Sequence, residues 1–325
     1  MPSRFEIKPQ IVVFLIGLAL TGWLVYQIRD ILVLLFVSFI IMAALRPGVD
    51  FLSKNGIPRF LAILLMYVVL ISVAAFFGTL IFPPLVSQTV RLVANLPAFF
   101  SNLPPFFQFD FNTLVQQITP LSQNVARFTV DVFSNILTVF TIAVFTFYFL
   151  LERNNLRKFL DIFVGDDLGD RLVIVVKDIE ERLGAWVRGQ LLLALIIGLA
   201  SYLGLFILGI SYVLPLALIA GILEMVPIIG PIISAIPAII VALTVSPGLA
   251  LAVAALYIII QQLENNLIVP TVMHKVLGMP PLAILLALMV GGRLGGVVGI
   301  ILAVPVLLVI QTVVGEFTPD AKKLN

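Results

Sequence analysis

Two carboxylates interrupt an otherwise apolar sequence and are the first candidates for chemistry. Glu224 lies within the apolar stretch 212–245, and Glu264 lies at the end of the apolar stretch 249–267. An ionised carboxylate at membrane depth is costly, so such a group faces a wet cavity, pairs with a cation or takes up a proton. We therefore regard both as candidate carriers of a proton or cation; the alternative for each is a position at the membrane interface.

Amide side chains surround Glu264. Gln262 and Asn266 are one helical turn apart, and Asn265 lies next to the carboxylate. Residues four apart are neighbours on a helix surface, so these amides could together bind the hydroxyl groups of a polar solute. The alternative is a polar helix end at the cytoplasmic interface, and the sequence leaves both interpretations open.

Two runs rich in proline and glycine, 224–231 and 291–296, lie near the middle of long apolar stretches. A helix broken inside a membrane frees backbone groups, and each unpaired group costs several kcal/mol there. Such groups could hold a solute or an ion; the alternative is that these residues only permit close packing or kinks. The candidate residues in the two runs are Pro227, Gly230, Pro231, Gly291, Gly292, Arg293 and Gly295.

Arg293 is the basic residue within the second broken stretch. At a hairpin tip it could neutralise Glu224 or Glu264, or bind an anionic substrate, or it could reach the cytoplasmic side. His274 lies next to Lys275 in a loop, where we expect an ordinary interface residue rather than a proton relay.

The composition excludes several functional classes. Of 325 residues, 61% are hydrophobic and 11% are charged, against about 25% charged in soluble domains. The net charge of +2 gives no basic surface for nucleic acid, and the absence of cysteine removes thiolate metal sites and cysteine nucleophiles. With one histidine and no paired Asp–Asp or His–Glu zinc pattern, we predict no enzyme, no metal site and no cofactor. The absence of a Walker-type phosphate-binding run indicates that ATP is not the direct energy source.

The apolar pattern predicts an all-α polytopic membrane protein, because roughly 20 apolar residues are needed to cross the hydrocarbon core as a helix. We expect six continuous transmembrane helices and two broken re-entrant hairpins. The continuous spans are 11–28, 31–52, 60–82, 132–151, 190–208 and 249–267, and the broken stretches are 212–245 and 281–314.

Most lysines and arginines fall on one side when these spans alternate, which places both termini in the cytoplasm. The two hairpins then open to opposite compartments. That arrangement is an inverted repeat, which is typical of transporters that bind substrate near the bilayer midplane. The alternatives are that each broken stretch crosses twice, or once as a kinked helix.

The predicted regions follow from the spans. Within the external region, a heptad-like apolar stripe beginning at Leu114 packs on its own protomer or contacts another subunit. The regions are the N-terminal helices 1–82, the external amphipathic region 83–131, the helix 132–151, the cytoplasmic amphipathic region 152–189, the transport core 190–314 and the cytoplasmic tail 315–325.

Several motifs together resemble the autoinducer-2 exporter (AI-2E) family of bacterial transporters. The most specific are the run 224–231, the run 262–266 followed by Pro270, and the run 278–281. The glycines of 291–299 and the run 303–305 complete the pattern. Two positions depart from it: Ile228 stands where the family often has an aromatic residue, and Met279 where it often has histidine.

The resemblance implies an exporter of the inner membrane, acting as a homo-oligomer, with a pentamer as one expected form. It links the chain to the quorum-sensing molecule autoinducer-2 or to exchange of sodium or lithium for protons. We expect secondary transport of a small polar solute by alternating access, driven by a proton or cation gradient. The alternatives are a sodium (lithium)/proton antiporter and an oligomeric channel or scaffold. The expected partners are the solute, protons or sodium, membrane lipid and further copies of the chain.

Overall fold

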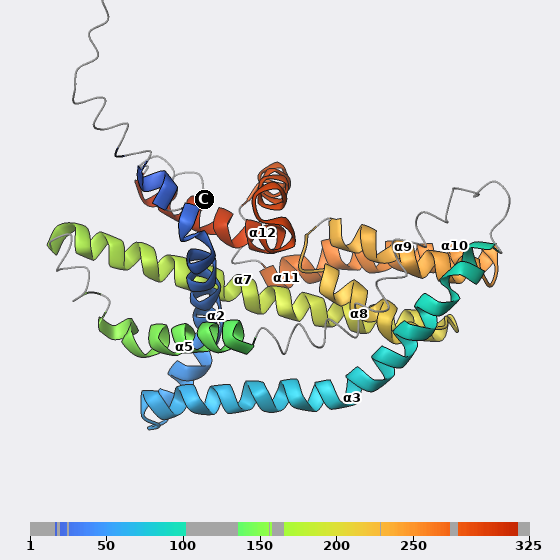
Figure 1. Ribbon diagram of the computed structural model, residues 1–325, viewed down its shortest axis with the longest axis horizontal. Helices are drawn as coiled ribbons and strands as arrows, with labels where there is room; N and C mark the ends of the chain where they lie inside the picture. Colours follow the sequence, from blue (N-terminus) through green and yellow to red (C-terminus); the bar gives the residue numbers. More distant parts are fainter. Residues whose placement is uncertain are drawn as a thin grey trace, which may run out of the picture.

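The computed structural model describes residues 17, 20–24, 26–101, 136–155, 157, 166–227, 229–273 and 279–317. Every regular element within these ranges is helical (Figure 1). The elements are α2 (Arg29–Lys54), α3 (Arg59–Ser101), α5 (Ile136–Glu152), a 3-10 turn (Arg153–Asn155), α7 (Asp166–Ile207), α8 (Val213–Leu223), α9 (Ile229–Leu243), α10 (Pro247–Leu263), a π-helix (Glu264–Ile268), α11 (Val269–Met273) and α12 (Pro281–Phe317).

Five of the described helical segments are long and apolar enough to cross a membrane. They belong to α2, α3, α7, α12 and the unit formed by α10, the π-helix and α11. The shorter apolar helices are α5, α8 and α9. The prediction of an all-α polytopic membrane protein is therefore confirmed, although half of the first predicted span, 11–28, lies outside the described residues.

The first broken stretch folds back on itself, as predicted. Its helices α8 and α9 have 11 and 15 residues and pack against each other. At 1.5 Å per residue they are about 17 and 23 Å long, which is shorter than the roughly 30 Å hydrocarbon core. The two helices are therefore suited to a re-entrant hairpin rather than to two complete crossings.

The second broken stretch also folds back, although it is a single element, α12. Gly296 has φ 57° and ψ −137°, a conformation that essentially only glycine adopts. On either side of this turn Gly291 and Gly299 are in contact, and a Cβ atom on either would overlap the carbonyl oxygen of the other. The red ribbon of α12 accordingly consists of two segments with different directions (Figure 1).

Two helices extend beyond their predicted limits. The cytoplasmic region 152–189 and the span 190–208 were expected to be separate, yet α7 runs through residue 189 without interruption. Its amphipathic part buries Val175, Ile179 and Leu183 against α2 and α12, so one helix serves both regions. Likewise α3 continues past residue 82 to Ser101 and bends midway (Figure 1), in a part of the chain that contains Pro83 and Pro84.

A buried ionic cluster joins α2, α7 and the 3-10 turn that follows α5. Glu180 of α7 is 2% exposed and accepts hydrogen bonds from Arg46 at 2.6 Å and from Arg153 at 2.8 Å. Asp50 accepts from Arg46 at 3.2 Å and lies 3.4 Å from Arg59. Glu180 belongs to the amphipathic region 152–189, and charged side chains are seldom fully buried. The structure buries it because two arginines from neighbouring elements neutralise its charge.

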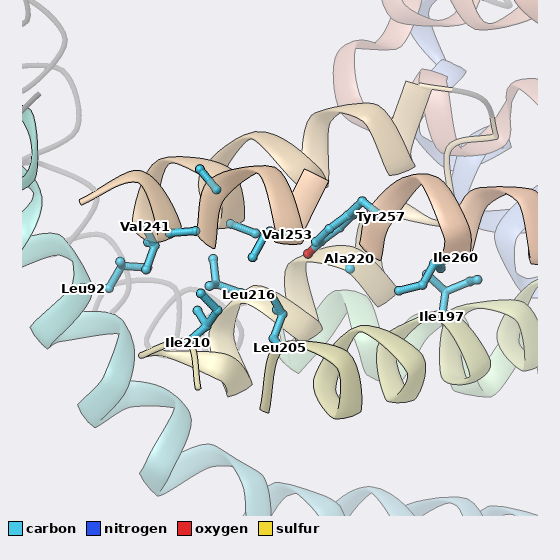
Figure 2. Close-up of a cluster of buried hydrophobic side chains, with 13 residues drawn as sticks. Leu92, Ile197, Leu205, Ile210, Leu216, Ala220, Val241, Val253, Tyr257 and Ile260 are labelled. Carbon is cyan, nitrogen blue, oxygen red and sulfur yellow. The ribbon is translucent and has the colours of Figure 1, made fainter. Parts of the chain in front are cut away.

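The largest apolar cluster lies between α7 and the helices α8, α9 and α10 (Figure 2). Leu205 of α7, Leu216 of α8 and Val253 of α10 are completely buried there. Small residues allow α7 and α8 to approach closely, since a Cβ on Gly221 would lie 2.8 Å from the carbonyl oxygen of Ala194. This bundle fixes the first hairpin against α7 and α10, and the candidate site lies at one end of it.

Candidate transport site

A cavity of about 490 Å³ lies among α7, the α8–α9 turn, the π-helix and the start of α12. This volume is in the range of small-molecule binding sites. Its lining combines a few polar groups with apolar walls. The lining residues are Trp186, Gln190, Leu193, Glu224, Pro227, Ile232, Gln261, Glu264, Asn265, Val269, Met279, Pro281, Ile284 and Val304.

Glu224 enters the cavity from the tip of the first hairpin. It follows the last residue of α8, and its side chain is 2% exposed. The side-chain amide of Gln190 on α7 donates a short hydrogen bond to the Glu224 carbonyl oxygen, so the tip is tied to α7. The Oε2 atom of Glu224 is buried and has no hydrogen-bond partner among the described residues.

The backbone of this tip is largely paired within itself. The N–H groups of Met225 and Val226 donate to the carbonyl groups of Ile222 and Leu223, and Gly230 N–H donates to Val226. Gly230 also packs against Leu223, whose carbonyl oxygen a Cβ would overlap. The tip therefore presents side chains to the cavity, whereas the sequence had suggested freed backbone groups.

Glu264 enters the cavity from the opposite wall. It is the first residue of the π-helix that follows α10, and it is 6% exposed. The wider turn of a π-helix changes the direction in which side chains point, and such turns are frequent at functional sites. Gln261 donates to Glu264 Oε2 at 3.2 Å and to Asn265 Oδ1 at 3.4 Å, which orients both groups.

The carboxyl groups of Glu224 and Glu264 face the same cavity from opposite walls, close enough for their charges to interact. No basic residue lines the cavity among the described residues. Two buried carboxylates in contact repel each other, so both cannot be ionised unless a cation lies between them. The pair can therefore share a proton or bind a cation, and the amide oxygens of Gln261 and Asn265 can supply further oxygen ligands.

The structure thus brings four of the predicted site residues together: Glu224, Pro227, Glu264 and Asn265. Pro231 follows Gly230 in the first turn of α9, behind the tip. Two other predicted residues, Gln262 and Asn266, are exposed and do not line the cavity. The Asn266 amide Nδ2 donates a hydrogen bond to Gln262 Oε1 at 3.1 Å.

The predicted residues of the second hairpin tip do not line this cavity in the described chain. Arg293 and Gly295 are exposed, Gly291 and Gly292 are half-buried, and the neighbouring Leu294 is 81% exposed. The base of that hairpin contributes instead, through Pro281, Ile284 and Val304. The predictions for Ile228 and His274 lie outside the described residues.

Sequence reasoning missed several lining residues because they lie far apart along the chain. Trp186 and Gln190 are one turn apart on α7 and face the cavity together. A polar amide at the start of an apolar stretch was the available signal for Gln190. Gln261 directly precedes the polar run 262–266, and its hydrogen bonds to Glu264 and Asn265 depend on the π-helix. Among the described residues, no group of three or more His, Cys, Asp or Glu residues could hold a metal ion.

Comparison with known proteins identifies relatives along nearly the whole chain. The sequence profile described as AI-2E family transporter matches residues 11–318. YrrI of Bacillus subtilis strain 168 is 30% identical over 316 residues, covering 91% of this chain and 88% of YrrI. YueF of the same bacterium is 30% identical over 301 residues, covering 85% and 81%. YhhT of Escherichia coli K12 is 26% identical over 298 residues, covering 86% and 83%. Their names describe transport proteins and specify no solute.

Proposed function

Because the chain belongs to the AI-2E family of transporters, we propose that its cavity is a transport site. Glu224 and Glu264 hold a proton or a cation there. The adjacent amides and apolar walls hold a small polar solute. The observation that carries this proposal is that two buried carboxyl groups from separate elements line the same cavity. One carboxyl belongs to a hairpin tip and the other to a π-helix. A movement of the hairpin would therefore change the site directly.

The predicted topology supports a cavity near the cytoplasmic end of the bundle. In that topology α7 runs outward from Gln190 and α10 runs inward toward Glu264, so both cavity walls lie in the inner half of the membrane. The structure then represents the conformation in which the site exchanges solute with the cytoplasm. Alternating access needs a second conformation in which the hairpin bearing Glu224 and Pro227 exposes the pair outward.

The solute class follows from the lining. Gln190, Gln261 and Asn265 offer amide groups, whereas Leu193, Ile232 and Val304 offer apolar surface. A small polar molecule with hydroxyl groups, such as an autoinducer-2-like furanone, matches this combination. With no basic residue among the lining residues, the cavity is poorly suited to a strongly anionic solute.

Proteoliposomes with an enclosed pH-sensitive dye test the proposal. With sodium or an autoinducer-2-like furanone supplied as the coupled substrate, an imposed pH gradient should discharge through wild-type protein. Glu224→Gln or Glu264→Gln should abolish this discharge because either change removes one half of the pair. Glu181→Gln, at an exposed position on α7, is the matched control and should behave as wild type. Unchanged discharge in the Glu224→Gln, Glu264→Gln double variant would remove the pair from the mechanism.

A sodium (lithium)/proton antiporter is the second candidate function. Two carboxylates with amide oxygens from Gln261 and Asn265 form an oxygen donor set of the kind that hard cations prefer. Pyranine-loaded vesicles should then change their internal pH on addition of sodium or lithium alone, without any organic solute. A response that requires the organic solute would favour solute transport instead.

We further propose that the chain acts as a homo-oligomer in the bacterial inner membrane, with both termini in the cytoplasm. The exposed turn at Gly295 and Gly296 supports this assembly, because non-helical backbone at membrane depth cannot face lipid. Crosslinking of a Gly295→Cys variant in membranes tests the contact. Flux without saturation or counterflow would point to an oligomeric channel, and a complete absence of flux with stable partner binding would point to a scaffold.

A further inference from the structure

Two hydroxyl groups lie inside the apolar cluster without adequate partners. Ser201 of α7 is 0% exposed and Tyr257 of α10 is 8% exposed. The two side chains are close enough to interact, but neither hydroxyl makes a well-formed hydrogen bond with any described group. Burying a hydroxyl without a compensating hydrogen bond destabilises a protein. The position of this pair therefore calls for a functional explanation.

The hydroxyl pair lies on the same helix faces as the cavity. On α10, Tyr257, Gln261 and Glu264 are spaced by four and three residues and so share one face. On α7, Gln190 and Ser201 are eleven residues apart, which is close to three complete turns. Each helix therefore carries one polar group at the cavity and one deeper in the bundle.

The two helices run in opposite directions, so their deeper groups come together. Residue 201 lies about 16 Å along α7 from Gln190, and residue 257 lies about 10 Å along α10 from Glu264, at 1.5 Å per residue. The Tyr257 hydroxyl oxygen points into the cluster beneath α10 (Figure 2). The hydroxyl pair thus continues the line of polar groups away from the cavity, toward the predicted outer side.

Two isoleucines separate the cavity from the hydroxyl pair. On the inner face of α7, Ile197 lies one turn from Leu193 and one turn from Ser201. On α10, Ile260 directly precedes Gln261 and lies one turn from Tyr257. Both belong to the same buried cluster and lie together between α7 and α10 (Figure 2). A contact between two apolar side chains excludes water and closes a path by dewetting.

We propose that Ser201 and Tyr257 form a second polar binding station on the transport path, and that Ile197 and Ile260 form the closed gate between this station and the cavity. The station carries no carboxylate and no basic group, so its occupant is water or a neutral hydroxyl-bearing solute that hydrogen-bonds with the two hydroxyls. This proposal rests on the proposed transport function and specifies the route that the solute takes beyond the carboxylate pair.

Because the chain contains no cysteine, a single introduced thiol reports water access without background. The test compares Ser201→Cys with Ala238→Cys in proteoliposomes treated with a small, water-soluble methanethiosulfonate reagent. Ala238 is also 0% exposed and belongs to the same cluster, but it lies on α9. We expect Ser201→Cys to react at least about ten-fold faster, since the reaction rate follows the population of opened states. Equal protection of both thiols would overturn the proposal.

The gate has its own test. Adding Ile197→Ala to the Ser201→Cys chain removes one side of the constriction, so the reaction rate should rise further. Adding Ile239→Ala, which shortens an isoleucine of the same cluster on α9, should leave the rate unchanged. An equal rise of the reaction rate in both chains would mean that the packing of the cluster had loosened in general. That result would contradict the proposed gate. Both measurements remain decisive even if the proteoliposomes show no proton flux.

Tyr257→Phe separates a transport role from a packing role. Removal of an inadequately partnered hydroxyl should leave the thermal unfolding temperature unchanged or raised, whereas flux should fall several-fold. Tyr67→Phe is the control, because the Tyr67 hydroxyl donates to the Ala143 carbonyl at 2.7 Å, on other helices. It should lower stability and leave the flux per folded molecule unchanged. Unaltered flux in Tyr257→Phe would contradict a role for its hydroxyl in transport.

Discussion

The hydrogen bond between Gln190 and the Glu224 carbonyl oxygen should determine how well the first hairpin tip is positioned. We predict that Gln190→Leu, which keeps a similar volume and removes the amide, reduces transport without unfolding the protein. The substitution leaves the buried Glu224 carbonyl without its donor. The hairpin itself keeps its packing against α7 and α10, so the fold should persist.

The magnitude follows from the lost partner. An unsatisfied buried acceptor costs about 1–3 kcal/mol. If that cost falls on the conformation that places the two carboxyl groups in contact, the population of this conformation falls about 5- to 150-fold, since 1.4 kcal/mol corresponds to a factor of ten. We therefore expect the initial rate of pH-gradient discharge to fall by roughly five-fold or more.

Gln88→Leu is the matched control. Gln88 on α3 accepts a hydrogen bond from the Leu214 backbone N–H at 3.3 Å, at the end of α8 that is remote from the cavity. Both variants thus remove one glutamine contact to the same helix, but only one of these contacts holds the tip. A Gln190→Leu discharge rate within two-fold of wild type would refute the reasoning, as would an equal loss in Gln88→Leu.

Two further predictions concern the fold that supports the site. Gly296→Ala should destabilise the protein by about 1–3 kcal/mol, because a Cβ is strained at its backbone angles. Gly248→Ala, at an exposed position of α10 with open space around it, should not lower the thermal unfolding temperature. Equal unfolding temperatures for the two variants would argue against the strained turn. Glu180→Ala should cost about 3–5 kcal/mol, because it leaves two arginines without their buried counter-charge. Urea unfolding of this variant alongside the exposed control Glu181→Ala measures the difference, and similar midpoints would show that the ionic cluster contributes nothing.

The sequence was sufficient to predict the helical membrane fold and both hairpins. Long apolar stretches have few structural solutions in lipid, and the glycines around residue 296 mark a turn that other residues cannot make. Helix ends were harder to predict. Hydropathy detects the apolar part of α7 or α3, but a helix can continue into an amphipathic segment without any change in its backbone pattern.

The candidate site was predicted only in part, for a geometric reason. Glu224 and Glu264 are unusual in their own apolar surroundings, so local sequence identified both. Their contact, and the participation of Trp186 and Gln190, depends on how α7, α8 and α10 pack, which no short segment encodes. Gln262 illustrates the converse: its residue type suggested binding, yet the helix turns it away from the cavity toward Asn266.

The central claim is that the two buried carboxyl groups share one proton when no cation is bound. Infrared difference spectroscopy on purified protein in sodium-free buffer measures this proton through the stretching band of a protonated carboxyl group. We predict a band that disappears when sodium is added or the buffer is made strongly alkaline. The band should be absent from the Glu224→Gln, Glu264→Gln double variant and retained in Glu181→Gln. A wild-type spectrum without such a band, or an unchanged band in the double variant, would contradict the account.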